Sequence, residues 1–160
     1  MIRDFKEGDE IQIADIYNHY VLNTHHTFET ETIKAQEMLS RILEIKQNYP
    51  FIVFEKDGQI LAYAYASRWK QRQAYDHTVE SSIYVHPDQH GKRIGSILYS
   101  SLLNELKQGD IHSVLAGISL PNDISIYLHE KLGFKKQGVL EEVGYKFDKW
   151  IDVAYWNLRL

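Results

Sequence analysis

The stretch from Tyr84 to Tyr99, YVHPDQHGKRIGSILY, combines residue types that could hold an anion. An apolar run ends at Pro87, a loop containing Gly91 follows, and a helical pattern begins there. The first turn of a helix presents backbone N–H groups without intrahelical partners and a partial positive charge, which favours a phosphate or diphosphate. Lys92 and Arg93 add cationic side chains. The segment predicts an anion-binding loop, although a glycine at this place can also serve turning and packing alone.

The loop matches neither of the two common phosphate-binding motifs. It contains no Gly-Lys-Ser or Gly-Lys-Thr, and the third glycine of the dinucleotide fingerprint is missing. A generic nucleotide-phosphate binder therefore stays open as an alternative. His86 and His90 are four residues apart, but Pro87 interrupts the helix that would pair them as metal ligands. We expect no metal site.

Glu80 is the one carboxylate on a strand that we expect over residues 78–86. The alternating pattern places it on a polar face with Ser82 and Tyr84, opposite an apolar face that contains Ile83. A carboxylate in this position could accept a proton from a substrate, directly or through water. The alternative is a strand glutamate that only faces solvent.

The elements that must position these residues follow from periodicity and from turn residues. Asp9 and Gln12 have the spacing of a capping box at the start of a first helix. Asp57-Gly58 suits the type I′ turn of a hairpin. The expected order is a strand at 2–5, helices at 9–21 and 32–47, strands at 51–56, 59–67 and 78–86, a helix at 91–107, a strand at 112–118, a helix at 122–132 and two strands within 134–160. The strand-helix-strand unit over 78–118 requires a parallel crossover, so we predict a mixed α/β sheet with helices packed on its faces.

Composition limits the class of protein. A chain of 160 residues is the size of one domain, and we expect residues 1–160 to form it. Cysteine is absent, which excludes disulfides, a thiol nucleophile and thiolate metal ligands. The net charge of −4 supplies no overall positive field for nucleic acid. No secretory signal or membrane span is evident, so we expect a soluble cytoplasmic protein.

The segment after the strand resembles motif A of the GNAT N-acetyltransferase superfamily. In that family, Arg/Gln-x-x-Gly-x-Gly/Ala follows a Val-x-Pro strand end and binds the diphosphate of coenzyme A. The frame here is His90-Gly91-Lys92-Arg93-Ile94-Gly95, with His90 at the first position and Arg93 in place of the first glycine. The resemblance implies a mostly antiparallel sheet with helices on both faces and acetyl-CoA as cosubstrate. It assigns the cofactor to Val85, His86, Pro87, His90, Gly91, Lys92, Arg93, Ile94, Gly95, Ser96, Ile97, Leu98 and Asn122.

A second segment, NDISIYLHEKLGF at 122–134, is similar to the family's Asn-led helix that ends in Leu-Gly-Phe. In the family the Asn contacts the cofactor, and a Tyr seven residues later often protonates the leaving thiolate. That position holds His129 here, and Tyr127 is a competing candidate. Two structural alternatives stay open: Asn122 could serve only as an N-cap, and His129 could be a packed helix residue.

Three further stretches resemble the phosphinothricin and methionine sulfoximine N-acetyltransferase branch: HHTFET, ASRWKQRQAYDHTVESSIYV and YKFDKWIDVAYWNL. This resemblance implies a homodimer that acetylates the amine of a small amino acid analogue, with Glu80 as the base and an N–H near Val85 polarising the thioester. Arg72 could bind an acceptor carboxylate with two hydrogen bonds, unless it is simply solvated. We expect the acceptor to be bound by Phe28, Glu29, Lys70, Arg72 and Tyr75.

Two alternatives to this activity remain at the level of sequence. One is a non-catalytic sensor that binds coenzyme A, which the departures at His90, Arg93 and His129 favour. The other is an acetyltransferase for a different amine, such as a polyamine. The three tryptophans, Trp69, Trp150 and Trp156, are expected in the core or in a dimer contact rather than against substrate.

Overall fold

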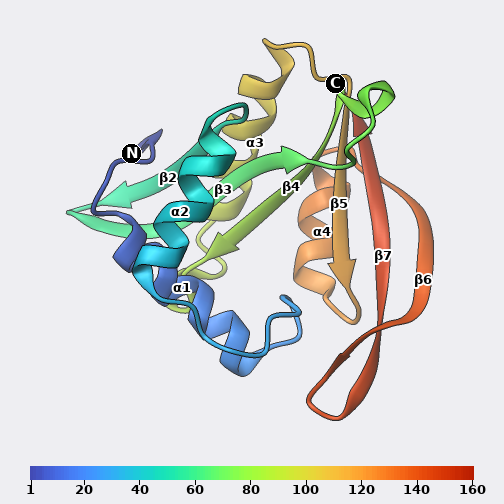
Figure 1. Cartoon of the computed structure of the whole chain (residues 1–160), viewed down its shortest axis with the longest axis horizontal. Helices are drawn as coiled ribbons and strands as arrows, with labels where there is room; N and C mark the ends of the chain where they lie inside the picture. The colour runs from blue at the N-terminus through green and yellow to red at the C-terminus, as the bar shows by residue number, and fades with distance from the viewer.

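A computed structural model describes all residues, 1–160, and its centre is a seven-stranded sheet. The strands are ordered β1-β2-β3-β4-β5-β7-β6, and every neighbouring pair is antiparallel except β4 and β5 (Figure 1). The prediction of a mixed, mostly antiparallel sheet is confirmed. The strands are β1 (Ile2–Asp4), β2 (Phe51–Lys56), β3 (Gln59–Arg68), β4 (Thr78–Val85), β5 (Ser113–Ser119), β6 (Lys135–Lys146) and β7 (Lys149–Arg159); the helices are α1 (Glu10–Asn23), α2 (Ala35–Lys46), α3 (Ile94–Lys107) and α4 (Asp123–Lys131).

Two apolar clusters place helices on both faces of the sheet, as expected. The larger cluster joins α3 to the sheet through Leu98, Tyr99 and Leu102, with α4 packed at its margin. The smaller cluster joins α1 and α2 to the opposite face through residues such as Ile13 and Ile42. Because both faces are covered, side chains of one strand alternate between two separate environments. The side chains of Glu80 and Ile83 therefore point to opposite faces of the sheet.

The local turn prediction between β2 and β3 is confirmed. Asp57 has φ 52° and Gly58 has φ 78°, the pair of positive angles that a type I′ turn requires. The resulting hairpin orients β3, which carries β4 on its other edge.

The capping box predicted at the start of α1 is wrong. The Asp9 carboxylate accepts hydrogen bonds from the Lys6 amide at 2.9 Å and from the Arg3 guanidinium at 2.7 Å, and makes no cap bond to the helix. Gln12 instead bonds the backbone of the β2–β3 hairpin, with the Ile60 amide donating to it at 2.9 Å. Asp9 thus pairs with Arg3 of β1 instead of making the weaker cap bond to its own helix.

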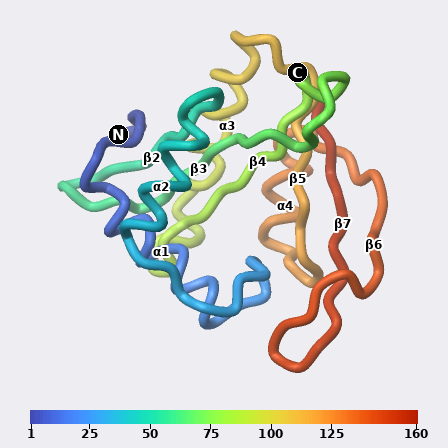
Figure 2. Tube along the Cα trace, viewed as in Figure 1, coloured from blue at the N-terminus to red at the C-terminus, as the bar shows by residue number.

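The feature that shapes the site is the separation of β4 and β5. Their parallel ladder covers only Thr78–Glu80 against Ser113–Leu115. Beyond Glu80 the two strands diverge, as Figures 1 and 2 show, and the rest of each strand is paired on its outer side alone. This divergence opens the middle of the sheet between the starts of α3 and α4.

Candidate active site

A cleft of about 160 Å³ lies between the diverging strands. Its walls come from the end of β4, the end of β5 and the first two turns of α4, and its mouth is formed by α1 and the loops on either side. The lining residues are Tyr20, His26, Ser81, Ser82, Ile83, Tyr84, Val85, His90, Ala116, Gly117, Ile118, Ser119, Asn122, Ile124, Ser125, Leu128 and His129.

The backbone of β4 presents one edge to this cleft. The His86 amide donates to the Leu61 carbonyl at 2.8 Å, which makes them a hydrogen-bonded pair of the β3–β4 ladder. Such pairs alternate along an antiparallel ladder, so the N–H and C=O groups of Ile83 and Val85 point away from β3, into the cleft. On β5, the Leu120 amide donates to the Asp152 carbonyl of β7, so Leu120 is also in a hydrogen-bonded pair. By the same alternation, the N–H and C=O groups of Gly117 point away from β7, toward β4. The cleft walls thus offer amide groups to an extended chain.

The loop between β4 and α3 confirms the strand-loop-helix unit, but its helix begins later than expected. The periodicity predicted a helix from Gly91, whereas α3 begins at Ile94. Gly91 has φ 78° and Arg93 has φ 63°, both in the left-handed region. Arg93 therefore adopts the conformation normally favoured by glycine, at the position where the resembling motif has one.

The start of α3 lies directly against the end of β4. A Cβ atom on Gly95 would be 3.3 Å from Cγ2 of Val85, so a larger residue would push the helix away from the strand. The amides of the first turn, including those of Gly95 and Ser96, have no acceptor within their own helix. Lys92 closes the loop by donating to the Asp88 carbonyl at 3.1 Å. This geometry can hold a diphosphate at the helix start.

Glu80 lies at the point where β4 and β5 separate. Its carboxylate approaches Gly117 so closely that a Cβ there would be 3.1 Å from Oε1, and the Tyr155 ring is also adjacent to that position. Glu80 makes no ion pair, and burial raises the pKa of its carboxyl group above the ordinary value. An unpaired carboxylate with a raised pKa is a better proton acceptor than an exposed one.

Of the two candidate proton donors, only His129 lines the cleft. It is buried, its Nδ1 lies 2.7 Å from the Ser125 carbonyl, and its ring packs edge-on against Tyr99 and Phe134. The contact with a carbonyl places the ring proton on Nδ1 and leaves Nε2 as an acceptor. Burial also lowers the pKa of His129. Tyr127 is exposed beneath the Lys131 ammonium group and does not line the cleft.

Asn122 is the N-cap of α4, and this leaves its expected contact with the cofactor possible. It caps α4, with its side-chain oxygen accepting from the Ser125 amide at 3.2 Å, and it also lines the cleft. The N-cap contact fixes the side chain at the cleft edge, so the two readings do not compete.

The expected acceptor residues fall into two groups. Phe28 and Glu29 lie in the α1–α2 loop on the same side of the sheet as Glu80. Glu29 pairs with Arg41 of α2 at 2.7 Å, and Glu80 shares its strand face with Tyr84, which packs against the α1–α2 cluster. The other group lies in the β3–β4 connection. Neither group is among the residues that line the cleft. There Lys70 lies over the Trp69 ring at 5.2 Å, Tyr75 meets that ring edge-on, and Arg72 is exposed.

The sequence interpretation missed residues that close the mouth of the cleft. Tyr20 donates its hydroxyl proton to the Val85 carbonyl at 2.5 Å and lies 2.9 Å from Nε2 of His90. It therefore ties α1 to the strand end and to the glycine loop. The helical spacing had marked Tyr20 only as part of an apolar face, and the nearby His25-His26 pair was the one local signal of a polar site.

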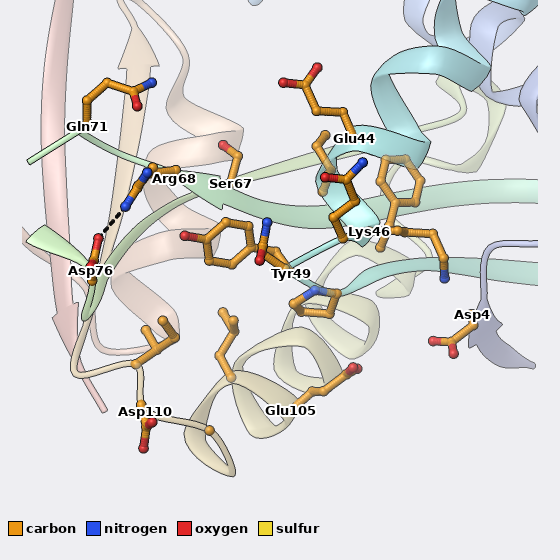
Figure 3. Close-up of a pocket in the computed structure, with 18 residues that line it drawn as sticks. Asp4, Glu44, Lys46, Tyr49, Ser67, Arg68, Gln71, Asp76, Glu105 and Asp110 are labelled. Carbon is orange, nitrogen blue, oxygen red and sulfur yellow. Dashed lines mark hydrogen bonds and ion pairs between the residues drawn. The ribbon is translucent and has the colours of Figure 1, made fainter. Parts of the chain in front are cut away.

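A larger groove of about 1090 Å³ lies elsewhere, between the ends of α2, β3 and α3. Figure 3 shows that its side chains carry both signs of charge and include the Arg68–Asp76 ion pair, at 2.5 Å. Glu44 and Glu105 are exposed there, and neither faces a base, a nucleophile or the glycine loop. Expected site residues such as Val85, Asn122 and His129 line the β4–β5 cleft instead. No set of three potential metal ligands comes together in the structure, and none of its helices is long and apolar enough to cross a membrane.

Comparison with known proteins defines the class first. A family model described as an acetyltransferase (GNAT) domain matches residues 2–155. The chain is 40% identical over 156 residues to a phosphinothricin N-acetyltransferase of Streptomyces viridochromogenes, covering 98% of this chain and 85% of that one. The chain therefore belongs to the GNAT acetyltransferase family, and it is an acetyl-CoA-dependent N-acetyltransferase.

Two further relatives indicate the branch of the family to which the chain is similar. An L-methionine sulfoximine/L-methionine sulfone acetyltransferase of Salmonella typhimurium is 36% identical over 161 residues, covering 99% of this chain and 94% of the relative. A crystal structure of a phosphinothricin acetyltransferase from Sinorhizobium meliloti in complex with acetyl-CoA superimposes with a TM-score of 0.96 at 36% identity, over 100% of this chain and 88% of that one. The resemblance to the phosphinothricin and methionine sulfoximine branch is confirmed.

Proposed function

We propose that the chain acetylates the amine of a small amino acid of the phosphinothricin or methionine sulfoximine type. The observation that supports this most is the unpaired, partly buried carboxylate of Glu80 where the strands part, next to Gly117 in the wall of the cleft. The names of the relatives supply the acceptor class. Thiol release from acetyl-CoA, measured against amino acid analogues and polyamines, tests the proposal: turnover confined to polyamines would contradict it.

The proposed reaction is a direct attack within one ternary complex. The loop over Gly91–Arg93 and the first turn of α3 hold the diphosphate, and the cleft-facing amides of β4 hold the pantetheine arm. Glu80 removes a proton from the ammonium group, directly or through water. The nitrogen then bonds the acetyl carbon, with the Val85 amide donating to the carbonyl oxygen. The carbon-sulfur bond breaks, and its electron pair leaves with the thiolate of coenzyme A. The nitrogen gives up its second proton to that thiolate, directly or through water, which leaves a neutral amide and free coenzyme A.

We propose His129 rather than Tyr127 as the residue beside the leaving thiolate, because only His129 lines the cleft. With its proton on Nδ1 and bonded to the Ser125 carbonyl, the neutral ring has no free N–H to donate, so the thiolate leaves unprotonated. A thiol has a pKa of about 8.5, so its anion is an adequate leaving group without protonation. We therefore expect His129→Gln to lower kcat by less than about tenfold and Tyr127→Phe to leave it unchanged. Steady-state rates of both variants check this. A loss in His129→Gln as large as that caused by removing the base would contradict it.

Arg72 tests the acceptor class. Its guanidinium is exposed and makes no ion pair, so it is free to bind an acceptor carboxylate with two hydrogen bonds. We expect Arg72→Ala to raise KM about tenfold for amino acid acceptors, which corresponds to the loss of about 1.4 kcal/mol. The control is the matched amine without a carboxylate, whose KM should not change. An equal rise for both acceptors would rule out carboxylate binding by Arg72.

The proposal also includes one domain over residues 1–160, assembly as a homodimer and a cytoplasmic location, where acetyl-CoA is supplied. Exposed apolar side chains support the dimer. They gather on the β6–β7 hairpin, where Trp150 is 62% exposed and Val143 is 54% exposed. Apolar surface of this kind, continuous along one hairpin, is typical of a protein interface. Sedimentation equilibrium tests the assembly: a mass of 18.8 kDa, that of a single chain, would exclude it.

A further inference from the structure

Two residues of β6 differ from the rest of that strand. From Lys135 to Val143 every residue is exposed, whereas Gly144 and Lys146 are buried. They are two positions apart, so they share one face of the strand. That face is covered by the α1–α2 loop, which lies far from β6 in the sequence.

A bulge directs this end of the hairpin. The register between β6 and β7 shifts between Leu140 and Gly144, and Glu142 adopts φ 51°. The Glu142 amide donates to the Asp152 carboxylate at 2.8 Å, which fixes the bulge. A bulge bends its strand and turns the following side chains to a new direction. The tip of the hairpin extends past the sheet in Figures 1 and 2.

Gly144 packs directly against Phe28. A Cβ atom added at Gly144 would lie 2.3 Å from two carbons of the Phe28 ring, which is far shorter than any contact between non-bonded carbon atoms. The ring therefore occupies the space that any other residue at position 144 would need. Gly138, on the same strand, differs in this respect, because a Cβ there would meet nothing within 4 Å.

Lys146 holds the residue before Phe28. Its ammonium group is buried and donates to the Thr27 carbonyl at 2.9 Å, without an ion pair. On the opposite side, the Thr27 hydroxyl lies 2.8 Å from the hydroxyl of Tyr17 on α1. The loop is thus fixed at one residue by both α1 and β6, and the next two residues are Phe28 and Glu29.

We propose that Gly144 and Lys146 are positioning residues that hold Phe28 and Glu29 in place as a wall of the acceptor pocket. This inference rests on the proposed function, which assigns Phe28 and Glu29 to the acceptor. The β6–β7 hairpin then determines how well the amino acid is bound, while the cofactor groups of β4, α3 and α4 lie outside its contacts with the loop.

The test compares Gly144→Ala with Gly138→Ala. The added methyl group at position 144 displaces the Phe28 ring, so KM for the amino acid acceptor should rise about tenfold while the Kd of coenzyme A is unchanged. Gly138→Ala, which adds the same methyl group in open space, should keep both values. Lys146→Met removes the bond to Thr27 without adding bulk near Phe28 and should raise KM in the same way.

A double-mutant cycle decides whether the effect passes through Phe28. In a Phe28→Ala background the ring is already absent, so Gly144→Ala should cause no further rise in KM. Additive effects of the two substitutions would overturn the proposal.

Hydrogen exchange of the loop separates this inference from the proposed function. Gly144→Ala and Lys146→Met should speed exchange of the amides around Phe28. Faster exchange with an unchanged acceptor KM would overturn the positioning role and leave the function standing. If the wild-type chain acetylated no amino acid at all, the proposed function would fall, and the inference with it, even if the exchange effect were seen.

Discussion

Glu80→Gln is expected to lower kcat by about 100- to 10 000-fold, the usual contribution of a general base. The amide has nearly the same shape as the carboxylate but cannot accept the ammonium proton. Coenzyme A should bind with unchanged affinity, because the glycine loop and the β4 edge are intact. Steady-state kinetics and calorimetric titration of coenzyme A measure the two effects separately. Glu141→Gln, an exposed change of the same kind on β6, is the control.

The pH dependence of this variant has a definite sign. Burial raises the pKa of Glu80 in the folded chain, so the charged form is the less favourable one there. The kcat/KM of the wild type should fall as the pH drops through that raised pKa, above the usual carboxyl range, and this limb should vanish in Glu80→Gln. Stability follows the same linkage. Protonated Glu80 favours the folded state, and this contribution to the free energy of unfolding is lost as the pH rises through the folded pKa. At neutral pH the wild type therefore carries a partly buried charge that the glutamine variant lacks, so the variant should unfold at no lower temperature than the wild type.

If Glu80→Gln retained the wild-type rate, Glu80 would not be the base. If instead the variant lost both turnover and coenzyme A binding, the loss would reflect a damaged cleft. The melting temperature and the cofactor titration distinguish these cases. Loss of the carboxylate alone should leave both unchanged, because glutamine keeps the packing of the side chain, whereas a damaged cleft should lower the affinity for coenzyme A.

Ser96→Asp is the second change with a large expected effect, and it should move stability and binding in opposite directions. Ser96 lies in the first turn of α3, where the resembling motif holds the diphosphate. A carboxylate there places a negative charge where the anion must bind. We expect the Kd of coenzyme A to rise about 100-fold or more, which corresponds to about 2.8 kcal/mol. The same carboxylate interacts favourably with the helix N-terminus and should stabilise the fold by about 0.3–1 kcal/mol.

The matched control is Gln108→Glu. It changes the net charge by the same amount but lies at the opposite end of α3, where Gln108 is the exposed C-cap. It should leave the Kd of coenzyme A unchanged. A weakened cofactor in both variants would indicate a general charge effect, and an unchanged Kd in Ser96→Asp would place the diphosphate elsewhere.

The order of elements could be predicted from sequence because its signals are local. Helical spacing from Leu98 to Leu106 predicted the buried face of α3, and Asp57-Gly58 predicted the hairpin. Two errors arose where hydrophobic periodicity carries no information. Asp9 bonds Arg3 of β1 instead of capping α1, which is a contact between side chains of different elements. The left-handed backbone of Arg93 delays the start of α3 to Ile94.

Part of the candidate site could also be predicted, because its signals are local. The residues of motif A and the Asn122 helix are contiguous in sequence, so a resemblance could find them. The divergence of β4 and β5 depends on strand register, which is a non-local property, and it determines which backbone groups face the cleft. Tyr20 reaches Val85 across 65 residues, and the sequence held no signal for that contact.

The most direct test of the account is product analysis of one reaction, in which the purified chain is mixed with acetyl-CoA and L-methionine sulfoximine. We expect equal amounts of free coenzyme A and of acceptor acetylated on its α-amino nitrogen. Coenzyme A bound tightly, with no acetylated amine formed from this or any other amino acid acceptor, would contradict it.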